Sequence, residues 1–302
     1  MPLRKIQSIL LPDALRILLH LLKERPISKL SQCAALDAIS QITFDNSDSA
    51  EIVLDSDATS AISVFIEFVK QSENVLLQFY ACYCIANLIR AQDLSENLLK
   101  AIRLLVIPTL LRISHTERND SHGIMMKEVA PLVLARLIEK HSNLQQTVVE
   151  TGLLTNATAF LSGLESPTLY RALANRLLLL ASSCSLYIGG RQILAGSLSV
   201  VRSLLTHSSS FVRAAACRVV QSLSRSLKQL RTSLVDSQVV EPLFAVSLLK
   251  SFSFVIILVI VYSCCQTAVQ TSSLMHLLRF VIWCWLFLLA KMKSSRVEDG
   301  RS

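Results

Sequence analysis

Apolar positions recur at helical spacing through most of the chain, and five segments share one layout. In each, a small residue is followed seven positions later by a branched apolar residue. These anchor segments lie at 32–42, 79–89, 129–138, 171–181 and 213–223. Seven residues are about two helical turns, so both members of a pair lie on one helix face. The small residue lets a neighbouring helix come close and the large one fills the core, so the pattern predicts a row of packed helices.

The spacing of the anchors indicates a repeat. Their small residues are Ala35, Ala81, Ala130, Ala172 and Ala216, which places successive anchors 42 to 49 residues apart. Armadillo and HEAT arrays have a period of about 40–47 residues. Between anchors we expect a short helix, a break and a second amphipathic helix, and three helices per unit favour armadillo. Gly152 and Gly196 stand where the short helix must end, which predicts a C-terminal cap.

These patterns predict an all-α fold, an armadillo-type right-handed α-solenoid of about five units over residues 1–250. Leu15, Leu18, Leu19 and Leu22 form the face of a second helix with no first helix before it, so we expect an incomplete N-terminal unit. The segment 114–123 has the polar composition of a surface loop inserted between two helices.

Residues 251–302 form a hydrophobic tail in which the repeat pattern stops. Residues 251–265 are continuously apolar, and a second run at 280–290 is followed by lysines and arginines. A transmembrane helix needs about 20 apolar residues, so a membrane anchor within 252–290 is one interpretation, with its basic end toward the cytosol. A buried hydrophobic cap and translated non-native sequence are the two others. The sequence leaves all three open.

Composition narrows the class of protein. Hydrophobic residues make up 52% and charged residues 17%, which excludes a disordered chain. Aromatic residues are 6%, with seven glycines and seven prolines, too few turn residues for a β-sandwich. The eight cysteines form no CxxC pair, which argues against zinc and favours a reducing compartment, the cytoplasm and nucleus.

No sequence motif for nucleotide, metal or hydrolase chemistry is present, and the six histidines are scattered along the chain. Catalysis needs a base held against a nucleophile or a metal, and no such group converges at readable spacing. We therefore expect no enzyme activity, no cofactor and no metal site.

Charge is distributed unevenly along the chain. Residues 37–73 hold eight acids and one base, Lys70, whereas 166–235 hold nine bases and no acid. The basic stretch predicts contact with an acidic partner through Arg213, Arg218, Arg225, Lys228 and Arg231, and hydrated ridges of the solenoid are the alternative interpretation. Nucleic acid is disfavoured as the partner because Tyr170, Tyr187 and Phe211 are the only rings in that stretch.

The third helix of each unit is expected to line a concave partner-binding face. Asn87 occupies the position where armadillo repeats often hold an asparagine that bonds a peptide backbone. Gln41 and Arg136 stand at the same position of their units, followed by Leu178 and Ser222. An unbroken asparagine ladder is absent, which argues against recognition of nuclear-import signals. A solvated Asn87 without a partner is the alternative.

The segment FVRAAACRVVQSLSRSLKQLRTSLVDSQVVEPLF, residues 211–244, resembles the armadillo repeat-containing protein 8 family. The runs RAAAC, SLSRS and LRTSL carry the resemblance, which extends more weakly over about residues 3–244. Family members are longer and continue with further repeats. The resemblance implies a non-catalytic scaffold subunit of the GID/CTLH E3 ubiquitin ligase, which acts in proteasome-mediated ubiquitin-dependent protein degradation.

The same resemblance implies the partners, which are the helical core subunits of the complex and a substrate receptor. An alternative function follows from the tail instead. A tail-anchored membrane adaptor would use the solenoid to bind proteins.

Overall fold

The computed structural model describes residues 3–23, 28–55, 58–90, 95–154, 161, 170–224, 239 and 242. All regular elements in these ranges are helical, and no strand occurs among them. They are α1 (Leu3–Lys23), α2 (Lys29–Ile42), α3 (Ser47–Asp55), α4 (Ala58–Gln71), α5 (Val75–Leu88), α6 (Glu96–Ala101), the π-helical turn η1 (Ile102–Val106), α7 (Ile107–Ser114), α8 (Ser121–Ile138), α9 (Ser142–Glu150), α11 (Tyr170–Ser183), α12 (Ile188–Ala195), α13 (Leu198–Leu205) and α14 (Ser210–Ser224).

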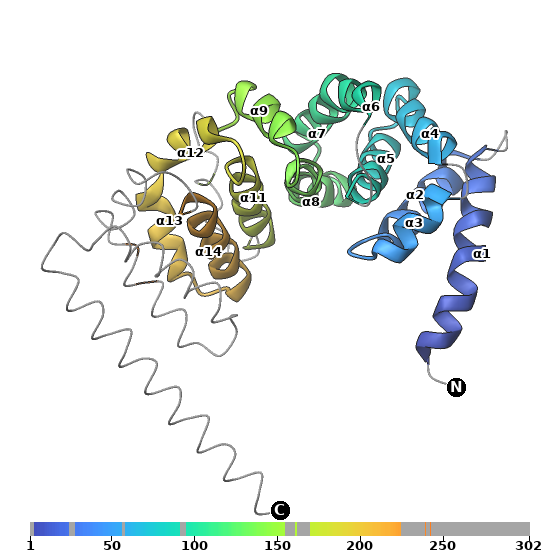
Figure 1. Cartoon of the computed structure of the whole chain (residues 1–302), viewed down its shortest axis with the longest axis horizontal. Coiled ribbons are helices and arrows are strands. Elements are labelled where there is room, and N and C mark those ends of the chain that lie inside the picture. The colour runs from blue at the N-terminus through green and yellow to red at the C-terminus, as the bar shows by residue number, and fades with distance from the viewer. Residues whose placement is uncertain are drawn as a thin grey trace, which may run out of the picture.

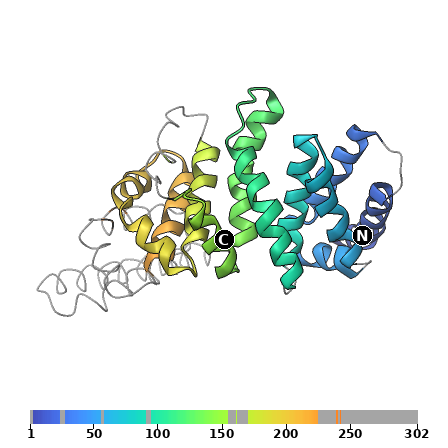
Figure 2. The same ribbon diagram turned by 90° about the horizontal axis from the view of Figure 1, so that it is seen from above.

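The helices form an arch in which every predicted anchor segment is a helix. The anchor helices α2, α5, α8, α11 and α14 follow one another along its inner side, while α4, α6, α7, α9 and α12 lie outside (Figure 1). Figure 2 shows the same row from above. Consecutive anchor helices pack directly on one another. The predicted all-α armadillo-type solenoid is confirmed.

Capping side chains decide where several anchor helices begin. The Asn74 side chain accepts hydrogen bonds from the backbone N–H groups of Leu76 and Leu77 at the start of α5. The Asp120 side chain does the same for Gly123 in α8. Such caps satisfy the N–H groups that a helix start leaves unpaired. Residues 115–120 of the predicted inserted loop connect α7 to α8, and its last residues belong to α8 itself.

The ends of α9 and α12 test the two predicted glycine caps. Gly152 follows α9 in the left-handed conformation, with φ 77°, as the cap prediction requires. Gly196 also follows its helix, α12, but stays right-handed with φ −66°. A side chain at position 196 would therefore meet no backbone strain.

One unit departs from the predicted layout of a short helix, a break and a second helix. Between α6 and α7 the chain continues through the π-helical turn η1 with no break. There the N–H of Ile107 donates to the carbonyl of Ile102, five residues back. The next residue is Pro108, which has no N–H and whose ring crowds the preceding turn. A widened turn makes room for that ring, so the prediction of a break was wrong here.

Two hydrophobic cores run along the arch. The first joins α1 through α9 and includes Leu179 of α11, and the second joins α11 through α14 with Val149 of α9. Leu178 packs against both cores. All five anchor alanines are buried, as predicted, and the cysteines of the described ranges are free and buried in the same cores.

Gln145 of α9 is the polar joint between the two cores. Its side chain is fully buried and its Nε2 donates to the carbonyl of Ile138 at 3.1 Å and to the hydroxyl of Ser185 at 2.8 Å. Its Oε1 accepts from the backbone N–H groups of Leu186 and Tyr187. One side chain thus bonds the C-terminal end of α8 to the segment that leads into α12.

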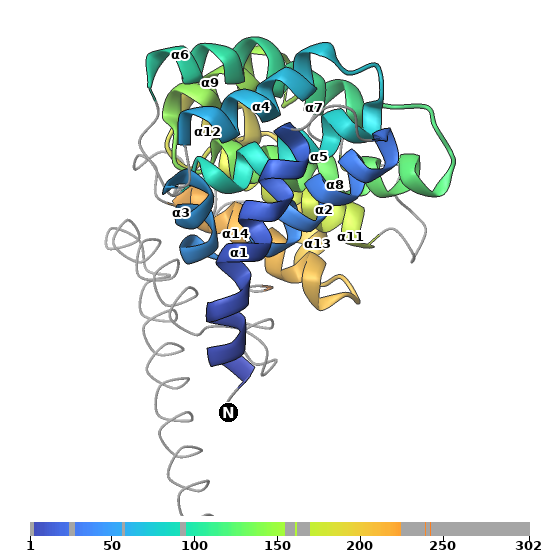
Figure 3. The same cartoon turned by 90° about the vertical axis from the view of Figure 1, so that its right-hand side faces the viewer.

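The helix α1 projects from the N-terminal end of the arch (Figure 3). It packs on α2, α3 and α4, and buries Leu15, Leu19 and Leu22 as the amphipathic pattern predicts. In the part of the chain that the structure describes, no helix has the length and apolarity to cross a bilayer. The predicted tail, 251–302, lies outside the described residues.

Candidate protein-binding surface

The inner face of the arch carries the candidate residues of the first three units. Gln41 is exposed on α2, where its Nε2 donates to the carboxylate of Asp37. Asn87 on α5 is only 3% exposed and Arg136 on α8 only 8%. Asn87 and Arg136 both line one cleft, of about 210 Å³, that Gln41 does not reach. The structure therefore brings together two of these three predicted residues.

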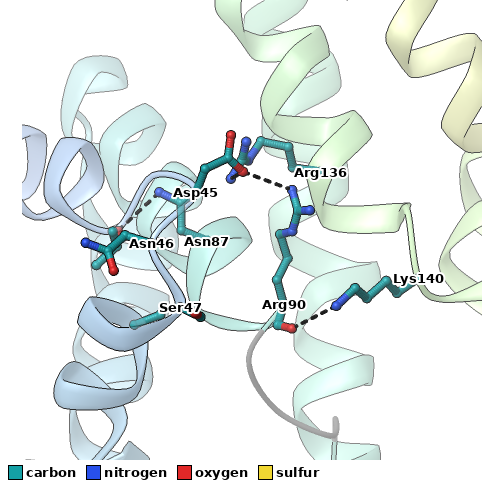
Figure 4. Close-up of a pocket in the computed structure, with 9 residues that line it drawn as sticks. Asp45, Asn46, Ser47, Asn87, Arg90, Arg136 and Lys140 are labelled. Carbon is teal, nitrogen blue, oxygen red and sulfur yellow. Dashed lines mark hydrogen bonds and ion pairs between the residues drawn. The ribbon is translucent and has the colours of Figure 1, made fainter. Parts of the chain in front are cut away.

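The turn after α2 closes over Arg136. Asp45 adopts a left-handed conformation there, with φ 49°, which aspartate tolerates better than most residues. Its Oδ1 lies 2.9 Å from Nη2 of Arg136 and 3.8 Å from Nη1 of Arg90 (Figure 4). The guanidinium of Arg136 also lies 4.1 Å from the ring centroid of Phe44. The hydrogen bond from Arg136 holds the pKa of Asp45 below its ordinary value.

Asn87 is bonded to the preceding anchor helix rather than directed to solvent. Its Nδ2 donates to the carbonyl of Ser40 at 2.9 Å and to the hydroxyl of Thr43 at 3.2 Å. These bonds cap the C-terminal end of α2. Within the described residues its Oδ1 is buried and has no partner. The amide donor that would bond a peptide carbonyl is therefore used inside the fold.

The charged side chains of the cleft are engaged in contacts within the fold. Arg90 pairs with Glu139 at 3.2 Å as well as with Asp45. Nζ of Lys140 donates to the carbonyl of Arg90 (Figure 4). The cleft is lined by Thr43, Asp45, Asn46, Ser47, Ala50, Asn87, Arg90, Arg136 and Lys140. These contacts join the turn after α2 to α5 and α8 across three successive units. We call the cluster of Phe44, Asp45, Arg90 and Arg136 the clamp.

Sequence reasoning missed Phe44, Asp45 and Arg90 as members of this clamp. The ion pair between Asp45 and Arg136 joins residues 91 positions apart. A single sequence carries no signal for a contact at that separation. Asp45 was noted only as one acid of an acidic stretch.

The candidate arginines of the later units differ in environment. Nη1 of Arg213 donates to the carbonyls of His207 and Ser208, which caps the turn after α13. Arg218 is exposed on α14, and no described residue forms an ion pair with it. The remaining candidates, Arg225, Lys228 and Arg231, lie outside the described residues.

The buried cysteines have no features of a nucleophile. Burial raises the pKa of the Cys184 thiol to about 12 and that of Cys217 to about 11. At neutral pH both are protonated, whereas the reactive form of cysteine is the thiolate. In the described ranges no group of three or more histidine, cysteine or acidic side chains is placed to hold a metal ion.

Comparison with known proteins agrees with the resemblance seen in the sequence. No protein-family model matches the chain. GID complex subunit 5 of Schizosaccharomyces pombe is 29% identical, with a match that covers 59% of this chain and 26% of the relative. The chain thus spans about a quarter of the length of that relative. The resemblance to a family of GID-complex subunits is confirmed by this similarity.

Similar solved structures are armadillo arrays and engineered proteins. An engineered protein has a TM-score of 0.61 at 18% identity, covering 87% of this chain and 60% of its own. The designed armadillo repeat protein YIII(Dq)4CqI has a TM-score of 0.57 at 16% identity, covering 85% of this chain and 99% of its own. Another, YIII(Dq.V1)4CPAF in complex with the peptide (KR)4, has a TM-score of 0.53 at 16% identity, covering 85% and 98%. At these identities the likeness shows the armadillo fold.

Proposed function

We propose that the chain is a non-catalytic scaffold subunit of a GID-type E3 ubiquitin ligase. The observation that carries the proposal is the similarity to GID complex subunit 5, found on an armadillo solenoid. In a solenoid each repeat contacts only its neighbours, which produces a long continuous surface suited to joining several proteins. The partners in this proposal are the helical core subunits of the complex and its substrate receptor.

The absence of catalysis is part of the same proposal. It is supported by the protonated, buried thiols and by the clamp, whose charged groups are engaged with one another. Catalytic groups need an accessible site and a pKa matched to their task, and the buried thiols have neither feature.

Affinity purification with mass spectrometry tests the assignment. The tagged full chain and a tagged 1–250 version are each purified from a cytosolic and nuclear extract, beside an unrelated armadillo protein with the same tag. We expect both versions to recover the same RING-bearing ligase subunits, which the control does not recover. Recovery of no ligase subunit by either version would sink the proposal.

Localisation to the cytoplasm and nucleus belongs to the proposal, and the tail-anchored adaptor remains its alternative. Carbonate extraction of membranes separates the two. Extraction of the full chain together with the 1–250 version supports the proposal. Retention of the full chain alone in the membrane pellet supports an anchor within 252–290.

A further inference from the structure

We propose that the inner surface of α11 and α14 binds an acidic segment of a partner protein. The binding surface, here called the basic–aromatic patch, consists of Tyr170, Arg171, Phe211 and Arg218. This inference rests on the proposed scaffold function and identifies the chemistry of one partner-binding surface. The patch differs from the cleft around Asp45, where the arginines already form ion pairs with carboxylates.

The first two residues of α11 and the start of α14 form one end of the patch. The rings of Tyr170 and Phe211 stack with centroids 6.1 Å apart and planes 25° apart. The guanidinium of Arg171 lies 6.0 Å from the Tyr170 centroid. Phe211 is 63% exposed, so its ring is available for an apolar contact. The stack with Tyr170 joins the ring of α14 to the first residue of α11.

Arg218 extends the patch along α14. It lies seven residues, about two helical turns, after Phe211, so both side chains project from the same face of the helix. Both are exposed. The two helices α11 and α14 pack side by side, and each carries one exposed arginine of the patch, Arg171 and Arg218 (Figure 1 shows the helices).

The positive charge of this region is complementary to an acidic partner. Residues 170–224 hold six arginines and no aspartate or glutamate. Arg191 donates to the carbonyls of Cys184 and Ser185, and Arg213 caps the turn after α13, so these two arginines are engaged inside the fold.

No ion pair joins a carboxylate of a neighbouring helix to the patch in the described part of the chain. Glu128 of α8, whose backbone carbonyl accepts from Asn175 of α11, forms no ion pair with a described residue. Glu139, which follows α8, pairs with Arg90, and Glu150 of α9 accepts from Gln146. Neither Arg171 nor Arg218 forms an ion pair with a described residue. Two exposed arginines without a described counter-charge, on the two helices whose rings stack, are complementary to an acidic peptide that carries one apolar side chain.

The ring geometry favours a protein over a nucleic acid. Proteins that bind single strands stack successive bases on separate aromatic faces along a basic groove. Here the two rings stack on each other, and Arg171 lies over Tyr170, so these faces are already partly used. One exposed apolar edge suits a leucine or phenylalanine of a peptide better than a series of bases.

Fluorescence anisotropy with a defined probe tests the inference on the full chain. The probe is a labelled 15-residue peptide of aspartate and glutamate with a single central leucine, and a matched asparagine and glutamine peptide is the neutral control. We expect the acidic probe to bind, and the Arg171→Glu, Arg218→Glu double variant to bind about tenfold more weakly. Phe211→Ala should weaken binding about threefold, because it removes the apolar contact only.

A matched charge change elsewhere shows whether the patch is specific. Lys70→Glu together with Lys100→Glu alters the net charge equally, on exposed positions of α4 and α6. We expect these changes to leave the affinity within about twofold. Circular dichroism checks folding, and the neutral pair Arg171→Gln, Arg218→Gln replaces the reversal if that variant unfolds.

Three outcomes would overturn the inference. The first is equal affinity of the double variant and the unchanged chain, and the second is equal loss in the lysine control. The third is displacement of the acidic probe by an oligo-dT strand that itself binds more tightly. Since affinity purification of ligase subunits is scored separately, the inference can fail while the scaffold proposal stands.

Discussion

The two halves of the inner face use arginine in opposite ways. In the first half, the turn after α2 brings the carboxylate of Asp45 to Arg136, and Phe44 covers the same guanidinium. In the second half, Arg171 and Arg218 are exposed on the helices that carry Tyr170 and Phe211, and neither forms an ion pair with a described residue. The comparison teaches that a neighbouring turn decides the role of a charged residue on an anchor helix. Where the turn supplies a counter-charge, the residue stabilises the fold. Where no turn supplies a counter-charge, the residue can bind a partner.

The largest expected effect concerns the two cores. Phe79→Ala should cost about 3–5 kcal/mol of unfolding free energy, because it leaves a cavity in the first core. Leu180→Ala should cost about 2–5 kcal/mol in the second. Hydrogen exchange should show faster opening mainly in the half that carries the change, since solenoid repeats couple through nearest neighbours. Uniform acceleration along both halves would mean that the arch unfolds as one unit.

The next largest effect on stability is expected at Gln145, which joins the two halves of the arch. Gln145→Ala removes hydrogen bonds to α8 and to the segment before α12, and it leaves the part-buried backbone N–H groups of Leu186 and Tyr187 without this acceptor. We expect a loss of about 2–3 kcal/mol in urea unfolding. Gln146→Ala, on the exposed side of the same helix, is the matched control. A loss below about 0.5 kcal/mol for Gln145→Ala would contradict the role of this side chain as the joint.

The clamp should contribute less to the free energy of unfolding than the cores or Gln145. Arg136→Ala should cost about 1–2 kcal/mol, from the lost cation–π contact and the lost ion pair to a carboxylate that is itself 61% exposed. The buried Nε of Arg136 has no acceptor among the described residues, and its removal offsets part of this loss. Thermal melts of Arg136→Ala, Asp45→Asn and the double variant give the coupling, and additive effects would exclude the clamp.

Acid should weaken the same clamp. The pKa of Asp45 is lower in the folded protein than its ordinary value of 3.8, so its contribution to stability is present above that pH. It is lost as the pH falls through the lower folded value. Melting temperatures measured between about pH 5 and pH 2 should therefore fall more steeply for the unchanged chain than for Asp45→Asn. Parallel curves for the two chains would show that this ion pair does not contribute.

The smallest expected effect is on stability in the basic–aromatic patch. Arg171→Glu and Arg218→Glu should change the unfolding free energy by less than about 0.5 kcal/mol each, because both side chains are exposed and form no ion pair with a described residue. The same variants should weaken binding of the acidic peptide. A large loss of stability in urea unfolding would assign these arginines to the fold rather than to a partner.

The periodic pattern alone determined the architecture. Small and branched apolar residues seven positions apart placed all five anchor helices, and Gly152 marked the left-handed end of α9. These features depend on local spacing and backbone preference, which a single chain displays directly. The break expected between α6 and α7 was wrong, because Pro108 was accommodated by a widened turn within a continuous helix.

Only the tertiary structure decided what the polar residues do. Asn87 and Arg136 share one position of the repeat, yet one caps α2 and the other holds Asp45 across 91 residues of sequence. The basic stretch separated in the same way into Arg213, which caps a turn, and Arg218, which is exposed. Helical periodicity fixes the face on which a side chain lies, but its partner depends on which turns the solenoid brings against that face. That is a property of packing between units, and no spacing within one unit records it.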